Sequence, residues 1–96
     1  MAGGLQEGLG HQAELALALG DPEEGLRLAS EQEGVCRSSG LREGLCRSLL
    51  VQGRAIAMLR GPFEARFLLE EASILAEESG LRAVAAEIAA ELARLG

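Results

Sequence analysis

The 96-residue sequence has no tryptophan, no tyrosine and no lysine, and it has only two phenylalanines. Because large aromatic side chains are nearly absent, the core must be built from leucine, alanine, valine and isoleucine. Side chains of this size suit closely packed helices better than strands, which favour β-branched and aromatic residues. No segment shows the strict polar–apolar alternation of a half-buried strand. The composition therefore predicts an all-α protein, with residues 1–96 forming a single small domain.

The lack of lysine leaves arginine as the main basic residue, and acidic residues outnumber it. The formal net charge is −6 and the isoelectric point is about 4.7. This balance argues against binding to the phosphates of nucleic acid and against an anionic membrane surface. No segment approaches the roughly 20 apolar residues of a membrane span, and no signal-peptide pattern precedes the first helix. We expect a soluble, cytoplasmic protein that binds neither nucleic acid nor a membrane.

Residues that carry chemistry are also scarce. Cys36 and Cys46 form neither a metal motif nor a redox CxxC pair, and we expect them to be small packing residues in a reducing compartment. His11, the only histidine, lacks the second histidine or the serine that a zinc site or a triad requires. The glycines of residues 8–13 resemble a dinucleotide fingerprint but follow no strand. We therefore predict no enzyme, no catalytic residue, no metal and no cofactor.

Helix boundaries are marked clearly in the sequence. In the segment GDPEE, Gly20 can end one helix in a left-handed conformation, Asp21 can cap the next, and Pro22 fits its first position. Gly53 interrupts a later helix, where we expect it to admit a neighbouring helix. Such boundaries and the helical spacing of apolar residues predict five helices, over residues 5–19, 22–37, 41–59, 62–79 and 81–95.

The chain also repeats itself at a distance of 40 residues. Pro22 and Pro62 are 40 residues apart, and so are the Gly-Leu-Arg triplets that begin at Gly40 and Gly80. A period of this length is typical of stacked helix pairs. It predicts an α-solenoid of tandem antiparallel helix hairpins, in units of residues 5–39, 41–79 and 81–96. The alternative is an ordinary five-helix bundle in which the spacing arises by chance.

The repeat resembles the tetratricopeptide repeat family. The segment GDPEEGLRLA resembles that family's tight turn and second helix, and Gly53, Ala65 and Ala72 fall on its three small packing positions. The resemblance covers nearly the whole chain, as about two and a half units. Three features depart from it. The period is 40 rather than 34, the usual aromatic positions hold leucine, alanine or isoleucine, and the first unit has Ala29 where a large residue is usual.

The resemblance implies a concave groove lined by the first, third and fifth helices. Under the 40-residue period, Glu14, Arg54 and Arg94 share one position, whereas Glu7, Arg47 and Glu87 share another. We expect arginine side chains there to hold an acidic or C-terminal segment of a partner. The alternative is that they pair with Glu87 and Glu91 of the same chain. The predicted groove residues are Glu14, Arg47, Leu50, Arg54, Ala57, Met58 and Arg94.

Three functions follow from this organisation as alternatives. The preferred one is a scaffold that binds a protein or peptide in the groove. The second is the sensor segment of a larger regulator, with a small effector bound between helices. The third is self-association as a weak homodimer through the last helix, whose alanine-rich sequence AVAAEIAAELA leaves apolar surface on more than one side.

Overall fold

A computed structural model describes residues 2–96 of the chain, and these form five α-helices without a strand. Each of the five predicted helices is present. The largest difference lies in the first helix, which begins at Ala2, whereas the prediction began at Leu5. The helices are α1 (Ala2–Ala18), α2 (Pro22–Ser39), α3 (Arg42–Arg60), α4 (Pro62–Glu78) and α5 (Arg82–Leu95).

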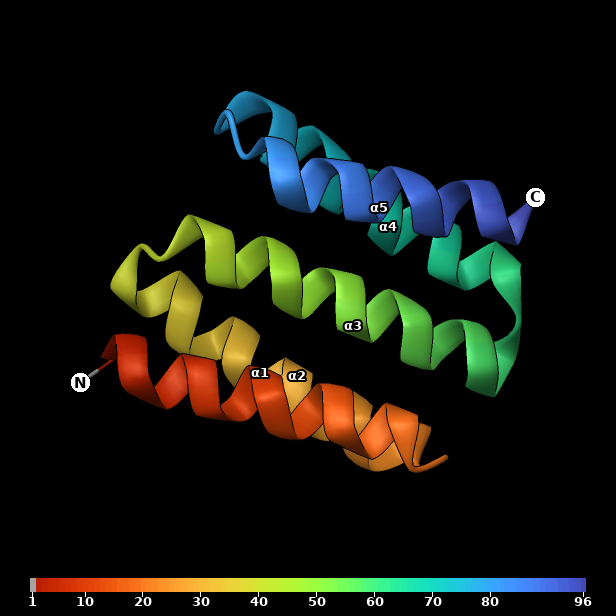
Figure 1. Cartoon of the computed structure of the whole chain (residues 1–96), viewed down its shortest axis with the longest axis horizontal. Helices are drawn as coiled ribbons and strands as arrows, with labels where there is room; N and C mark the ends of the chain where they lie inside the picture. Colours follow the sequence, from red (N-terminus) through yellow and green to blue (C-terminus); the bar gives the residue numbers. More distant parts are fainter. Residues whose placement is uncertain (1) are drawn as a thin grey trace.

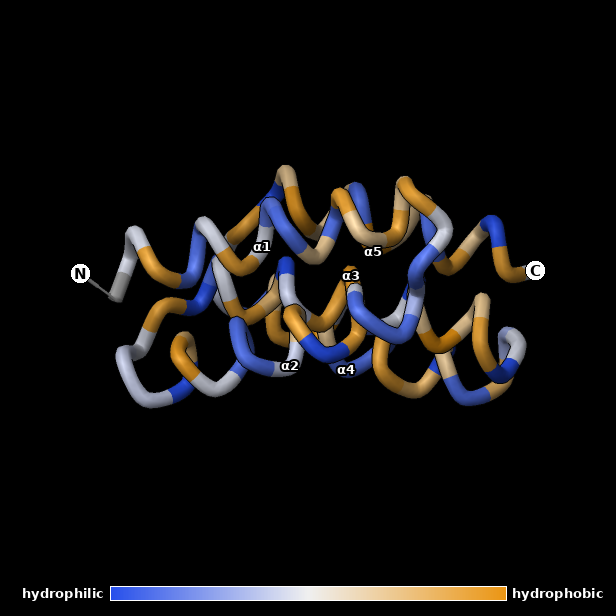
Figure 2. The backbone as a smooth tube through the Cα atoms, turned by 90° about the horizontal axis from the view of Figure 1, so that it is seen from below, coloured by the Kyte–Doolittle hydropathy of each residue, from blue (hydrophilic) through white to orange (hydrophobic). Residues whose placement is uncertain are grey.

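The helices form two layers, and consecutive helices run antiparallel and lie in different layers. Helices α1, α3 and α5 lie side by side in one layer, and α2 and α4 lie behind them in the other (Figure 1, Figure 2). The molecule measures 36 × 29 × 18 Å, and its shortest dimension corresponds to about two helix diameters. Every helix packs against the next one in the chain, and α3 also contacts α1 and α5. The fold is therefore the predicted all-α stack of antiparallel helix hairpins.

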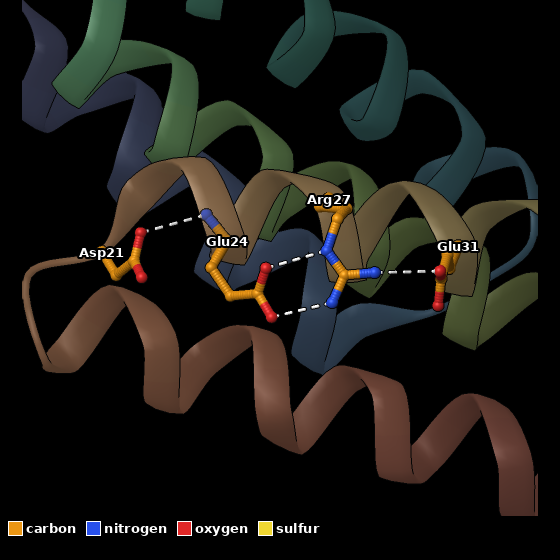
Figure 3. A network of polar contacts seen from close by, with 4 residues as sticks. All are labelled: Asp21, Glu24, Arg27 and Glu31. Atoms are coloured by element: carbon orange, nitrogen blue, oxygen red, sulfur yellow. Dashed lines mark hydrogen bonds and ion pairs between the residues drawn. The ribbon is translucent and has the colours of Figure 1, made fainter.

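The turn between α1 and α2 has the predicted geometry. Gly20 has a φ of 82°, in the left-handed region that glycine adopts without strain. The Asp21 carboxylate accepts a hydrogen bond of 3.2 Å from the backbone N–H of Glu24, which satisfies one of the free donors at the start of α2. Arg27 then pairs with Glu24 and Glu31 along the exposed face of α2 (Figure 3). These local contacts fix where α2 begins.

The 40-residue period is visible in the burial of side chains. The second helix of each hairpin buries residues at equivalent positions, so α2 and α4 present the same face to their neighbours. The buried pairs are Gly25 and Ala65, Ala29 and Leu69, Gln32 and Ala72, and Cys36 and Ala76.

Small residues allow the helices to approach closely. A Cβ atom at Gly53 would lie 2.6 Å from Cγ of the buried Leu69, so α3 and α4 touch there as the sequence predicts. Gly44, for which the sequence suggests no role, lies against α2, where an added Cβ would be 2.6 Å from Sγ of Cys36. Phe63 and Phe67 are both exposed, at 75% and 65% of their surface. The core therefore contains no aromatic side chain among residues 2–96.

Leu5 near the start of α1 and Leu19 in the turn after it are exposed large apolar side chains. The reason is the position of α1 at the edge of the stack, where only α2 and α3 cover it (Figure 1). An edge helix buries one face and leaves the other to solvent.

Replacing Gly53 by alanine tests the close packing of α3 on α4. We expect Gly53→Ala to lower the free energy of unfolding by about 1–2 kcal/mol, because the added methyl group displaces Leu69 and this strain exceeds the gain in helix propensity. The control is Gly34→Ala in α2, where an added Cβ meets no atom within 4 Å. The control should stabilise by up to about 1 kcal/mol. Urea denaturation measures both, and stabilisation by Gly53→Ala would contradict the packing.

Candidate functional site

A hollow of about 580 Å³ lies between α1 and α3. Residues of α1 form one wall, and the turn before α3 together with α3 itself forms the other. Gln32 of α2 reaches the hollow from the layer behind. The lining residues are Gln6, Glu7, Gly10, His11, Glu14, Gln32, Gly40, Leu41, Arg42, Glu43, Gly44, Arg47 and Val51.

The charges on the two walls are arranged differently. Glu7 and Glu14 on α1 form no ion pair with any residue of the described range 2–96. On the opposite wall, Arg47 forms two ion pairs. Its Nη1 lies 3.0 Å from Oε2 of Glu87, and its Nε lies 3.6 Å from Oε2 of Glu43. The α1 wall therefore presents carboxylates that are free to bind a cation, whereas the charge of Arg47 is largely compensated.

The floor of the hollow is a small polar cluster. Gln32 donates a hydrogen bond of 2.9 Å from Nε2 to Oε1 of Gln6, and the Cys36 thiol donates to the same oxygen at 3.5 Å. Gly10 makes room for the Gln32 amide, because a Cβ at Gly10 would lie 2.8 Å from Nε2. Gln32 is only 3% exposed, and its Oε1 has no hydrogen-bond partner within residues 2–96. Buried polar atoms are normally paired, so this oxygen is unusual.

The predicted groove arginines pair with acidic residues of α5. Arg47 donates to Glu87, and Arg54 donates from Nε to Oε1 of Glu91 at 3.1 Å. Arg94 donates to the other oxygen of the same carboxylate. The alternative in which these arginines pair within the chain is therefore confirmed. Glu91 ties α3 to α5, and its two arginines are engaged in that contact.

The other predicted groove residues lie in separate places. Leu50 is only 2% exposed and packs in the main hydrophobic core. Its assignment to the groove floor was wrong, because its side chain is buried in the core and does not reach the surface. Ala57, Met58 and Arg94 line a second hollow of about 330 Å³ near the ends of α3 and α5. Glu14 and Arg47 line the hollow between α1 and α3. The predicted set therefore divides between two hollows, the core and the α3–α5 contact.

The ionisation of the buried groups follows from their contacts. Burial opposes the charge of Glu91, but hydrogen bonds from Arg94 and Arg54 outweigh it and hold the pKa of this carboxyl below its usual value. Burial raises the pKa of the Cys36 and Cys46 thiols. Both cysteines are free and buried, so these thiols are poor nucleophiles and act as packing groups.

Sequence reasoning missed the residues that form the floor of the hollow, namely Gln6, Gly10 and Gln32. Its helical pattern counted apolar side chains, so it omitted the two glutamines, and it considered the early glycines as part of a dinucleotide fingerprint. The usable signal was in the repeat, since position 10 is glycine where position 50 is leucine. It also missed the exposed pair of Phe63 and Phe67, whose rings meet edge to face at 5.3 Å on α4.

Within residues 2–96, no group of three histidine, cysteine or acidic side chains could hold a metal ion. None of the helices in the same range combines the length and the apolar character that crossing a membrane requires. Comparison with family models, with curated proteins and with solved structures found no match for this chain.

The Glu91 contact predicts a specific pH dependence. Because its folded-state pKa is lowered, Glu91 stabilises the fold above its unfolded pKa, and this contribution is lost as the pH falls through the folded value. We expect Glu91→Gln to lower the free energy of unfolding by about 1–3 kcal/mol at pH 7. The loss is limited because both arginines reach solvent, which weakens their attraction to Glu91. We also expect a shallower loss of stability than in the parent between about pH 5 and 3.

Urea denaturation at a series of pH values measures this difference. The control is Glu70→Gln on the outer face of α4, which removes the same charge from an exposed side chain that forms no ion pair with residues 2–96. A parent and a Glu91→Gln variant with parallel pH profiles would refute the contribution of Glu91.

Proposed function

We propose that this chain is a helical-repeat module that binds a protein or peptide along the α1, α3 and α5 layer. The observation that carries this proposal is the hollow of about 580 Å³ between α1 and α3. Its volume lies within the range of about 300–1,000 Å³ found for ligand sites, and a few polar groups converge on it. The proposal includes a non-enzymatic role and kinship with tetratricopeptide-like repeats, which the two-layer stack of hairpins and its small packing residues support.

The arrangement of charges locates the main contact. An acidic partner held by Arg54 would have to displace Glu91, which is 5% exposed and already receives hydrogen bonds from two arginines. An internal carboxylate competes at a high effective concentration. At the hollow, by contrast, Glu7 and Glu14 have no ion pair to break within residues 2–96. We therefore place the primary contact between α1 and α3, and secondary contacts along α3 and α5.

A second candidate function is self-association through the outer face of α5. Four alanines on this face are exposed, although their equivalents on α3 are covered by α4. A helix from a second copy would fit there closely, because alanine lets two backbones approach. The equivalent pairs are Ala86 and Cys46, Ala89 and Leu49, Ala90 and Leu50, and Ala93 and Gly53.

Selection from a random 12-residue peptide library, displayed on phage, tests the binding proposal. We expect enriched peptides to shift the backbone amide signals of Gly10, Gly44 and Arg47 in ¹H–¹⁵N correlation spectra of the labelled protein. Residues on the outer face of α4, such as Glu70 and Glu71, should not shift. If enriched peptides shift only the amide signals of the outer face of α4, or if no peptide gives saturable shifts, the proposed groove function is wrong.

Multi-angle light scattering tests self-association. We expect a mass that rises from monomer toward dimer over the high micromolar range, and Ala89→Arg should abolish that rise because it places a charge in the centre of the exposed face. Ser73→Arg on α4 is the control, and it should leave the rise unchanged. A constant monomeric mass for the parent chain would exclude this candidate.

A further inference from the structure

The first hairpin, α1–α2, lacks the apolar contact that fills the second hairpin, α3–α4. In the second hairpin the contact consists of three buried side chains of the core. In the first, two amides and a glycine stand in their place and form the floor of the hollow. The equivalent pairs are Gln6 and Cys46, Gly10 and Leu50, and Gln32 and Ala72.

The floor offers an acceptor that the chain itself does not use. The Gln32 amide is engaged on one side only, since Nε2 donates to Gln6 while Oε1 has no partner within residues 2–96. Gln32 lines the hollow, so its Oε1 can accept a hydrogen bond from a donor that enters there while Nε2 keeps its bond to Gln6. A group that donates a hydrogen bond there would remove the unsatisfied acceptor.

The wall above the floor offers negative charge. Glu7 and Glu14 are seven residues apart, which places them two turns apart on one face of α1. Both line the hollow. The cations of the opposite wall are Arg47, which two glutamates compensate, and Arg42, which donates to the hydroxyl of Ser79 and forms no ion pair within residues 2–96. The chain also carries a net charge of −6, so a cationic ligand is favoured on the α1 side.

We propose that the hollow between α1 and α3 receives the guanidinium group of an arginine from a partner peptide. The guanidinium carries five donors in a planar fork, so it can donate to a carboxylate of the α1 wall and to Oε1 of Gln32 at the same time. An ammonium group is a point charge without this fork and meets the two acceptors less well. This inference rests on the proposed function and names the chemistry of the partner.

The probe is the blocked tripeptide acetyl-Gly-Arg-Gly-amide, titrated into ¹⁵N-labelled protein. We expect saturable shifts of the Gly10 and Gly44 backbone signals and of the side-chain amide signals of Gln6 and Gln32. The matched probes acetyl-Gly-Glu-Gly-amide and acetyl-Gly-Cit-Gly-amide, in which citrulline replaces the charged guanidinium with a neutral urea, should leave these signals unmoved. The citrulline probe keeps the planar shape of the arginine side chain without its charge, so the comparison of these two probes shows whether the charge is required.

Two variants test the two acceptors. Glu14→Gln should raise the Kd of the arginine probe by about tenfold, the effect of losing one charge-assisted hydrogen bond. Gln32→Ala should weaken it by a similar factor, and it should fold because alanine occupies the equivalent position in α4. Glu70→Gln is the matched control, with the same charge change outside the hollow, and should leave the Kd unchanged. Retention of the native amide spectrum checks folding in each case.

The outcomes distinguish this inference from the function on which it rests. If the arginine probe causes no saturable shift, or if Glu14→Gln and Glu70→Gln weaken it equally, the guanidinium site is refuted. If the glutamate probe or an uncharged library peptide shifts the hollow instead, peptide binding stands and the arginine assignment falls. If neither the probes nor the library peptides reach the hollow, both proposals fall.

Discussion

Close contact between helices through glycine and alanine is the constraint on which this structure depends. The chain has only two aromatic residues, and both lie on the surface of α4. Its core must therefore be closed by bringing backbones together, as Gly53 does against Leu69. Protein interiors are packed to the density of organic crystals, so a single methyl group added at such a contact displaces its neighbours and changes the stability. The equivalent burial in α2 and α4 shows that the same solution is used in both hairpins.

The candidate site lies where the first hairpin departs from this close apolar packing. Gly10 leaves space that Leu50 fills in the second hairpin, and the Gln32 amide occupies part of that space without satisfying its oxygen. Between α3 and α5, by contrast, Glu91 draws two arginines together and closes the layer. One end of the layer is therefore held by ion pairs, while the other end presents free carboxylates above a polar floor. The difference between the two ends gives the binding proposal its location.

The helices could be predicted closely because each boundary is marked by local chemistry, as at Gly20 and Asp21. The hairpin order followed from the 40-residue period. The site was less accessible to sequence. Spacing places Arg54 within reach of the groove and of Glu91 alike, and it does not decide between a partner's carboxylate and the internal ion pair that the structure contains. Leu50 was misplaced for the same reason, since the direction of a side chain depends on how the helix is rotated against its neighbours. A buried glutamine such as Gln32 cannot be recognised from the helical spacing of apolar residues, because it is polar and is not counted in that pattern.

The contact between α1 and α2 holds two amides and a glycine at the floor of the hollow, whereas the equivalent contact between α3 and α4 is apolar and filled. A double-mutant cycle tests this difference. Gly10→Leu alone should destabilise, because its Cβ would lie 2.8 Å from the Gln32 amide. Combined with Gln32→Ala, the leucine should fill the contact between α1 and α2 as Leu50 fills that between α3 and α4. Urea denaturation of the four proteins should give a favourable coupling of about 1 kcal/mol or more. Simple additivity of the two changes would show that the two contacts are not equivalent and would contradict this structural difference.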